Sequence, residues 1–559
     1  MLRSVNRLLT LSALMASFAA ASQASAAVLA DNLPAGALMT LQTNGAGPTF
    51  DRLLGLVRSV SKDRELTDVA GGLGGLFKGS IGNEATLGLF SVGSDRGEGG
   101  FAPALLAVTR ADVSSGSLFQ TMIPKKPGAK VGKYTFVRTD DLFVGMGGGL
   151  VYLSSDKGLL MGYLARLGGK VAPRLNASAA YTVPTRAVGE QELSLYFNFS
   201  ATAKVIRSQL GKVLLPRLLS PIVDALDTLG SYAAGFSTTD AGLTAQAAHV
   251  PNVAGKDKPL YSILTHTTDF NVQSVIPASA EAVTASACAN ESASYLGRWL
   301  TRIDLLDPTG FLTDSQLAAN LDQSARYLGD ECATVTLAGG GRAGLNQTDK
   351  AAALGYGVTY QRVDDMDAAR AQLPAYVTSL NTALQGLAGT LDTLGGTLGS
   401  MEGAAAGKKP GGRPQGASAS VQGLQTQLND LKKQVAAIRV VYGFRGDYLV
   451  MAYSDRALRA ALDVAAPVLS DDQAFGASQL DFVGVSGWSY GVAGQKVSAP
   501  DFAAALKPLE GLGYPRNIGA SVGTVLADLF NRYGGMSSQS TVEGGLIMQK
   551  SAVSYDWQK

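Results

Sequence analysis

The chain has 559 residues, more than one hydrophobic core usually supports, so we expect at least two domains. Its 47 basic and 45 acidic residues give a net charge of +2, which argues against nucleic acid as a partner. Hydrophobic residues make up 46% of the chain, which is ample for packed cores and excludes a disordered protein.

The first 26 residues are predicted to be a secretory signal peptide. Arg3 and Arg7 precede a charge-free apolar stretch over residues 8–21, and Ala24-Ser25-Ala26 forms a small-x-small cleavage site. The apolar stretch is too short to span a hydrocarbon core of about 30 Å as a stable helix. We therefore expect an exported protein of the periplasm or cell surface. Peripheral contact with the membrane is compatible with this location.

One pattern of the chain occurs twice, in the same order. The matching segments are LPA at 33–35 and IPA at 276–278, GNEAT at 82–86 and GDECAT at 329–334, LVYLSSDKGL at 150–159 and LVMAYSDRAL at 449–458, and GLTAQ at 242–246 and GLIMQ at 545–549. Such self-similarity indicates a tandem duplication. We expect a first repeat over 27–255 and a second over 256–559.

The first repeat predicts several short strands and a few helices. Strand-like stretches lie at 37–43, 85–92, 104–109, 134–137, 142–146, 150–154, 193–199, 232–237 and 243–250. Helical patterns begin at 50 and 112 and cover 156–167 and 201–229. Strands joined by short glycine turns pair antiparallel, because a parallel neighbour needs a long crossover. The predicted class is α+β: two tandem repeats, each an antiparallel or mixed sheet with helices on one face.

The second repeat contains an insertion over 371–440 with a heptad pattern. Its apolar positions advance in alternating steps of four and three, and a second apolar run follows at 421–438. The two runs predict a helical hairpin with a flexible basic tip over 402–420. The first run presents six leucines as a candidate contact surface for a partner: Leu380, Leu384, Leu387, Leu391, Leu394 and Leu398.

Three interpretations of this hairpin remain open. Between 371 and 400 the only charged residue is Asp392, and the many glycines weaken an isolated helix. The hairpin could therefore pack against its own domain. Alternatively, its small residues allow close approach of another helix, from an envelope protein or from a second copy of the chain. The third interpretation is insertion into lipid.

Cys288 and Cys332 are the two cysteines of the chain. In an oxidising compartment an isolated pair predicts a disulfide, which requires Cα atoms within about 7 Å and therefore neighbouring strands. Two free buried thiols and a metal site are the alternatives. We expect no cofactor.

The repeated Ser-Asp pairs each stand between a predicted strand and a predicted helix. These are Ser155 with Asp156 and Ser454 with Asp455. Short oxygen-bearing side chains at such places cap free backbone N–H groups. We expect helix N-caps here, and no acid-base catalysis.

Other residue patterns give little support to catalysis. Ser489 lies in GWSYG, which matches the G-x-S-x-G elbow of serine hydrolases, but no convincing helix follows, and both histidines, His249 and His266, precede the serine. Lys78-Gly79-Ser80 fails the phosphate-loop spacing.

The paired segments together resemble the bacterial domain-of-unknown-function family numbered 3352, in both copies. The resemblance covers most of residues 30–555 outside the insertion and rests on the LPAG, GNEATLGLF or GDECATVTL, and LVYLSSDKGLL or LVMAYSDRALRAAL segments. It implies an exported bacterial envelope protein and supplies no catalytic or ligand residue.

Our first hypothesis is a non-enzymatic envelope protein that acts as a scaffold or binding module, with the hairpin as its contact. The second is a carrier of lipid or another apolar ligand, which requires an apolar cavity of several hundred Å³. The third is a hydrolase that uses Ser489.

Overall fold

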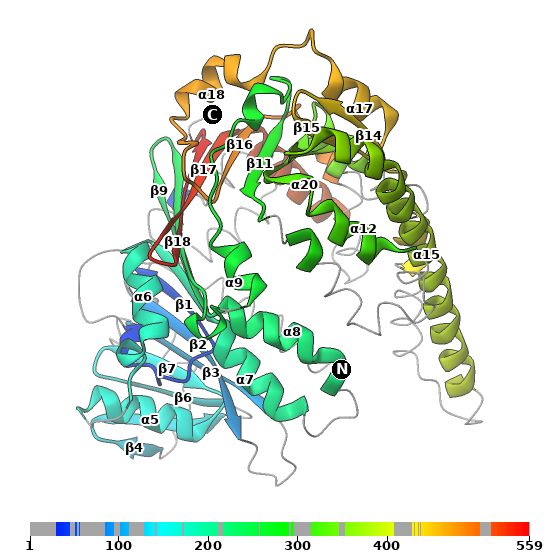
Figure 1. Ribbon diagram of the computed structural model, residues 1–559. Coiled ribbons are helices and arrows are strands. Elements are labelled where there is room, and N and C mark those ends of the chain that lie inside the picture. The colour runs from blue at the N-terminus through cyan, green and yellow to red at the C-terminus, as the bar shows by residue number, and fades with distance from the viewer. Residues whose placement is uncertain are drawn as a thin grey trace. The chain divides into compact units, whose positions relative to one another are not determined.

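The structure is a computed structural model, and its chain divides into two compact units (Figure 1). The first unit contains residues 1–265 and 497–559, and the second contains residues 266–496. The described residues are 29–44, 51–52, 55, 84–93, 101–110, 128–139, 142–169, 173–210, 216–256, 258–289, 292–295, 315–345, 353–406, 428–429, 431–433, 435, 438–502 and 516–557. The predicted signal peptide, most of the helix predicted at 50, and the helix predicted at 112 lie outside them.

The first unit has an antiparallel sheet of twelve described strands. They are β1 (Met39–Asn44), β2 (Glu84–Gly93), β3 (Phe101–Arg110), β4 (Ala129–Val131), β5 (Tyr134–Thr139), β6 (Leu142–Gly147), β7 (Leu150–Ser154), β8 (Leu193–Asn198), β9 (Ser231–Thr239), β10 (Gly242–Val250), β17 (Tyr533–Glu543) and β18 (Leu546–Tyr555). Hydrogen-bonded neighbours follow the order β4-β5-β6-β7-β3-β2-β1-β8-β9-β10-β18-β17.

Helices and short 3-10 turns accompany this sheet. They are η1 (Leu29–Asn32), α5 (Lys157–Leu167), η2 (Leu175–Ala177), α6 (Ala179–Val188), α7 (Phe199–Leu210), α8 (Pro216–Leu229), η3 (Val253–Gly255), α9 (Pro259–Leu264), η7 (Ala499–Phe502) and α20 (Arg516–Asn531). The main core joins η1, α5, α6 and the central strands through buried residues such as Leu33, Leu106, Tyr152, Leu160 and Tyr196. The helix predicted over 201–229 is two helices, α7 and α8, of which the second begins at Pro216.

The second unit has a smaller antiparallel sheet. Its described strands are β11 (Ala282–Ala287), β12 (Leu328–Thr336), β13 (Gly357–Val363), β14 (Val441–Arg445), β15 (Tyr448–Ala452) and β16 (Gly487–Val492). Neighbours follow the order β14-β15-β13-β12-β11-β16. Its helices are η4 (Val272–Ser274), α12 (Leu317–Ser324), α13 (Gly340–Leu345), α15 (Met366–Ala406), α17 (Asp455–Leu462), η6 (Leu469–Asp471) and α18 (Gln473–Ala477).

Six strands of the first unit have the same neighbour order as the second sheet. We match the six strands of each set in the order in which they follow along the chain. The neighbour order β6-β7-β3-β2-β1-β8 in the first unit then equals the neighbour order β14-β15-β13-β12-β11-β16 in the second. The segments 150–159 and 449–458 each contain a strand followed by a helix, β7 with α5 and β15 with α17. The coarse prediction of a mixed α and β protein with antiparallel sheet is confirmed.

The predicted boundary at residue 256 does not match the two units, because the end of the chain belongs with the first. Strand β18 pairs antiparallel with β10 from Gly242 opposite Ser554 to His249 opposite Ile547 (Figure 1). The predicted counterparts 242–246 and 545–549 therefore lie on adjacent strands. An unpaired β10 would expose a row of backbone N–H and C=O groups, and β18 satisfies them. This long-range pairing was not visible in the local sequence pattern.

Helix α15 is the longest described helix, with 41 residues (Figure 1). At 1.5 Å per residue its length is about 60 Å. It starts at Met366, five residues before the predicted insertion, and continues to Ala406, into the segment predicted as a flexible tip. Residues 407–420 of that tip lie outside the described residues, and of the predicted return arm a few residues between 428 and 435 are described, as helix.

Candidate functional site

The first unit contains a cavity of about 340 Å³ between α6 and the sheet. Strands β1, β8 and β9 contribute side chains from one side, and η1, the 3-10 turn η2 and α6 contribute from the other. The lining residues are Asp31, Thr40, Gln42, Asn44, Asn176, Tyr181, Thr182, Thr185, Arg186, Val188, Gly189, Glu190, Ser194, Leu195, Tyr196, Ala233 and Ala234. Twelve of these seventeen side chains carry a hydrogen-bonding group, and apolar surface lies between them, so the lining is mixed.

The sheet side of the cavity follows from strand periodicity. Successive side chains of a strand point to opposite faces, which places Thr40, Gln42 and Asn44 of β1 together on the cavity face. Leu41, between them, packs on the other face in a cluster with Leu87 of β2. The sequence alternation of β1 thus gives a polar face toward α6 and an apolar face away from it.

Pairing between β1 and β8 sets which groups meet across the sheet. Thr40 is opposite Tyr196, and Gln42 is opposite Ser194. Thr40 and Gln42 are 2% and 7% exposed, so both polar side chains are nearly removed from bulk water. Burial of a polar side chain costs free energy unless the side chain forms hydrogen bonds. The hydrogen-bond partners of these side chains therefore need to be identified.

Helix α6 covers the opposite side of the cavity. Within it, the hydroxyls of Thr182 and Thr185 donate to the carbonyl oxygens of Ser178 at 3.2 Å and of Tyr181 at 2.6 Å. These bonds use the hydroxyl hydrogens and leave oxygen lone pairs as acceptors. The rings of Tyr181 and Tyr196 meet edge to face at 5.0 Å, which anchors α6 to β8.

Three polar side chains of the cavity have properties that bear on what it could bind. The hydroxyl of Tyr196 is buried, which raises its pKa, and a hydrogen bond with Asn198 lowers it. Burial raises the pKa of the Asp31 carboxyl, a nearby Asn176 lowers it, Glu84 raises it and Arg186 lowers it. Gln42 donates one amide hydrogen to Asn44 at 2.8 Å, and an amide has a second donor and a carbonyl acceptor.

The second unit has a corresponding place, which the strand pairing locates. Strand β11 pairs with β12 and β16, as β1 pairs with β2 and β8. Glu84 is opposite Asn44, and Glu331 of the matching GDECAT segment is opposite Ala287. Gln42 stands two residues before Asn44 in β1, and Ala285 stands two residues before Ala287 in β11. Gln42 therefore corresponds to Ala285.

At that place the second unit is filled with aromatic side chains. Trp488 is opposite Ala285, where the first unit has Ser194 opposite Gln42. Trp488 is 2% exposed, and its ring lies 5.5 Å from Phe475 of α18 and 5.6 Å from Phe482. Polar residues surround a cavity in one unit, and apolar residues form the core in the other.

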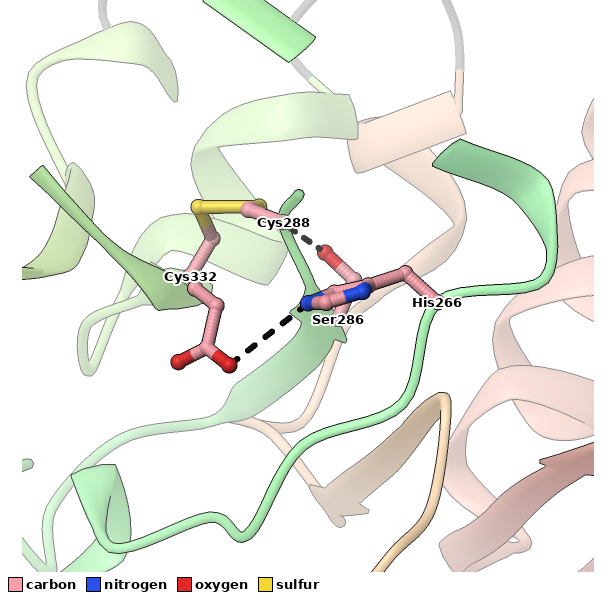
Figure 2. Close-up of a disulfide and its surroundings, with 5 residues drawn as sticks. His266, Ser286, Cys288 and Cys332 are labelled. Carbon is pink, nitrogen blue, oxygen red and sulfur yellow. Dashed lines mark hydrogen bonds and ion pairs between the residues drawn. A yellow bond between two sulfur atoms is a disulfide. The ribbon is translucent and has the colours of Figure 1, made fainter. Parts of the chain in front are cut away.

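The predicted disulfide is present in the second unit. Cys288 and Cys332 are bonded, with Cα atoms 5.8 Å apart, and they close a loop of 44 residues (Figure 2). Cys332 lies in β12 opposite Ser286 of β11, so the two strands are neighbours as expected. This bond replaces the alternatives of free thiols and a metal site.

His266 lies beside the disulfide and faces Asp330. Its Nε2 is 3.5 Å from a carboxylate oxygen of Asp330, an ion-pair distance without the geometry of a hydrogen bond (Figure 2). The hydroxyl of Ser286 is 3.8 Å from the sulfur of Cys288. His266 is thus a half-buried residue next to the cystine, with Asp330 as an acidic neighbour.

Two buried glutamates were not predicted as sites, although both stood in the repeated segments. Glu331 is fully buried and accepts hydrogen bonds from the backbone N–H of Asn271 and Val272 and from the hydroxyl of Tyr448, at 2.6–2.7 Å. Burial raises its pKa, and these bonds lower it. Glu84 accepts from the N–H of Leu29 and pairs with Arg110 in the first unit. Both carboxylates fix the start of a 3-10 turn.

The helix N-caps are partly as predicted. Asp156 caps α5 by accepting from the N–H of Leu159 at 2.7 Å, and Ser454 caps α17 by accepting from Ala457 at 3.1 Å. The prediction that Ser155 is an N-cap was wrong, because its hydroxyl accepts a hydrogen bond from the N–H of Leu105 in β3.

The prediction that Asp455 is an N-cap was also wrong. It is the first residue of α17, where its charge faces the N-terminal turn without the capping geometry. The two junctions therefore use caps one position apart.

Four leucines of the candidate partner surface pack within the second unit. Leu380 and Leu384 lie against the core that contains Leu373 and Val377, and Leu387 and Leu391 pack with Val435 of the return arm. Leu391 is 8% exposed. Leu391 is therefore buried within the second unit, and Leu380, Leu384 and Leu387 are half-buried there. A partner contact through these residues stays a prediction. The side chains of Leu394 and Leu398 lie outside what is described.

Ser489 does not stand at a nucleophile elbow. It lies within β16, opposite Thr284 of β11, and its hydroxyl donates to that of Thr284 at 3.3 Å. An elbow requires a sharp strand-to-helix turn, and this serine is in extended, paired backbone.

His249 is likewise part of the packing. Its Nε2 lies 2.5 Å from the carbonyl oxygen of Leu229, between the rings of Phe199 and Tyr232. Burial lowers the pKa of this histidine.

Two further findings concern the described residues alone. No group of three or more His, Cys, Asp or Glu side chains among them is placed to hold a metal ion. None of the helices in this part of the chain is long and apolar enough to cross a membrane.

Comparison with known proteins gives little. No protein-family profile and no curated protein sequence matches the chain. Among solved structures, crystal forms I and IV of TP0453 are similar, with 12% and 14% sequence identity and TM-scores of 0.23 and 0.25. Each covers 44% of this chain and 90% or 89% of TP0453. At TM-scores of this size the likeness supports no conclusion about fold or function.

Proposed function

We propose that the protein is an exported bacterial envelope protein that binds a small polar ligand in the cavity of its first unit without transforming it. The observation that carries the proposal is the contrast at corresponding places, Ser194 beside a cavity of mixed lining and Trp488 within a packed core. Small-molecule sites are concave and contain a few well-placed polar groups. Packing could have filled this place, as it does in the second unit.

Export is supported by chemistry as well as by the predicted signal peptide. The disulfide between Cys288 and Cys332 indicates an oxidising compartment. Together with the signal pattern of residues 1–26, it favours the periplasm or the cell surface. The envelope role also draws on the resemblance to the domain-of-unknown-function family 3352, which remains a prediction.

We further propose that the two units derive from tandem copies, with the binding site kept in one. The equal strand orders and the paired roles of Glu84 and Glu331 support this interpretation. Under it, the second unit is the supporting copy, and its insertion is an addition. The disulfide also occurs only there, since Ala85 stands where the second unit has Cys332.

A role as carrier of lipid or another apolar ligand has less support. It requires an apolar cavity, and the lining of this one is mixed, with hydroxyl, amide and charged groups set among its apolar surface. A protein partner is still part of the proposal. It is an envelope protein or a second copy that contacts the insertion beyond Leu391.

The binding proposal is tested by filling the cavity with the residue that fills the other unit. The full mature protein would be incubated with the small-molecule fraction of the bacterial envelope and studied by native mass spectrometry. We expect a bound small molecule on the wild type and its loss in Ser194→Trp. Val253→Trp, which places the same side chain at a residue 62% exposed in the same unit, should keep it. A wild type without bound molecules, or a ligand retained by Ser194→Trp, contradicts the proposal.

The partner proposal needs a deletion that spares the core. Removing 371–440 would take away Leu373 and Val377, which are buried in the second unit. Leu391 and Leu428 belong to one cluster, so a short Gly-Ser linker can replace 393–427. Cross-linking in intact envelopes should then lose the partner bands while a far-UV spectrum stays native. Unchanged cross-links would remove this part of the proposal.

A further inference from the structure

The charges around the first-unit cavity disfavour an anionic ligand. Asp31 and Glu190 contribute two carboxylates, and Arg186 contributes one cation. Arg186 also interacts electrostatically with Asp31, which uses part of its charge within the protein. Anion sites instead gather arginines, lysines or helix N-termini.

The remaining polar groups of the lining favour a ligand that both donates and accepts. Gln42 and Asn44 offer amide groups of both kinds, Thr185 offers oxygen lone pairs, and Ser194 offers a hydroxyl. A hydroxyl group on a ligand donates one hydrogen bond and accepts others, so several hydroxyls match such a mixed lining.

The cavity also has apolar and aromatic walls. Leu195, Ala233 and Val188 contribute aliphatic surface, and Tyr181 and Tyr196 contribute rings. Such walls suit a ligand whose C–H groups lie between its hydroxyls. A volume of about 340 Å³ is near the lower end of ligand pockets, which are about 300–1,000 Å³.

We propose that the cavity of the first unit binds a small neutral molecule that carries several hydroxyl groups on a compact carbon skeleton, such as a monosaccharide or cyclitol. This inference rests on the proposed function and adds the chemical class of the ligand. The polar side chains hold the hydroxyls, and the rings and aliphatic groups contact the C–H faces. The described residues that line the site all belong to the first unit.

Isothermal titration of the full mature protein with five probes tests the class. D-glucose and myo-inositol are neutral and hydroxylated, sodium glucuronate is anionic, glucosamine is cationic at neutral pH, and octanoate is apolar with a charged end. We expect saturable heat from at least one neutral probe. Affinity for glucuronate should be at least about tenfold weaker than for glucose, a factor that corresponds to losing one good polar contact.

Two variants locate the binding. Gln42→Leu keeps the side-chain size and removes the amide, and it should weaken the neutral probe by about tenfold or more. Ser194→Trp should abolish the heat, while Val253→Trp should leave it unchanged. A far-UV spectrum and an unfolding curve for each variant show that loss of heat is not loss of folding.

The outcomes separate this inference from the function it rests on. If glucuronate, glucosamine or octanoate binds in a Ser194→Trp-sensitive manner and neither neutral probe does, the ligand class is wrong and the binding function stands. If neutral probes bind equally to the wild type and to Ser194→Trp, the cavity is not their site, and the inference fails. Absence of heat with all five probes overturns the class as well. In that case the envelope-extract experiment decides separately whether the cavity binds anything.

Discussion

The two units place opposite chemistry at one position of the same strand arrangement. Where β1 and β8 meet α6, the first unit has Gln42 and Ser194 beside a cavity. Where β11 and β16 meet α18, the second has Ala285 and Trp488 inside its core. Large buried aromatic side chains contribute strongly to stability. The first unit does without this contribution, as proteins do at functional sites, where local stability is lower than packing could give.

The comparison predicts the largest effect at Trp488. Trp488→Ala should lower the free energy of unfolding by about 3–5 kcal/mol, since the ring is almost fully buried among Phe270, Phe475 and Phe482. Urea denaturation followed by circular dichroism measures it. Ser194→Ala, at the corresponding place in the first unit, should change stability by less than about 0.5 kcal/mol. Equal losses in the two variants would show that the two places are not a core and a cavity.

The disulfide is the second difference between the units. Cys288→Ser with Cys332→Ser opens a loop of 44 residues and should cost about 4 kcal/mol in the chain-entropy model. Urea unfolding of the oxidised wild type and the double variant gives the value. Two thiols per unfolded, unreduced wild-type chain in a thiol titration would refute the bond.

The sequence predicted the strands better than their partners. Segments 150–154 and 243–250 alternate locally, and the structure has β7 and β10 there. The pairing of β10 with β18 joins residues about 300 apart and depends on sheet geometry that no local pattern contains. The disulfide was predictable because the chain has one pair of cysteines and an exported pattern.

The cavity could not be predicted in the same way. Helix α6, which covers it, has Pro184 in its interior, a residue that normally breaks or kinks a helix, and the local sequence predicts no element there. The sequence of β1 alone gives a polar face without its surroundings. The pairing with β8 is what brings Ser194 and Tyr196 opposite Gln42 and Thr40. Trp488 stands beside Ser489 in the GWSYG segment, and nothing in the local sequence indicates the burial that distinguishes the second unit.

The buried glutamates give a difference that depends on pH. Glu331 faces the neutral hydroxyl of Tyr448, whereas Glu84 faces the cation of Arg110. Burial raises the pKa of Glu331 in the folded protein. The folded state then keeps its proton to higher pH than the unfolded state does, so this group's contribution to stability is full below the unfolded pKa and declines as pH rises through the folded one.

Glu331→Gln should remove this decline. We expect the free energy of unfolding of the variant to rise relative to that of the wild type between pH 4.5 and pH 7, because the glutamine amide does not titrate. Urea unfolding at several pH values measures the difference. Parallel pH profiles for the two proteins would mean that Glu331 has the same proton affinity in the folded and unfolded chain.

The smallest effects concern the helix caps, which differ by one position between the two strand-helix junctions. Asp156→Ala and Ser454→Ala each remove a side-chain acceptor from the first turn of a helix and should cost about 1 kcal/mol. Asp455→Ala removes a charge near the helix start without a capping bond, which is worth about 0.3–1 kcal/mol and less in salt. Urea unfolding at low and high ionic strength separates the two mechanisms, because a hydrogen-bonded serine cap is insensitive to salt and a charge-dipole interaction is screened. If Asp455→Ala cost more than Ser454→Ala at high salt, the cap would be the aspartate at both junctions, and the shift of one position between the junctions would be wrong.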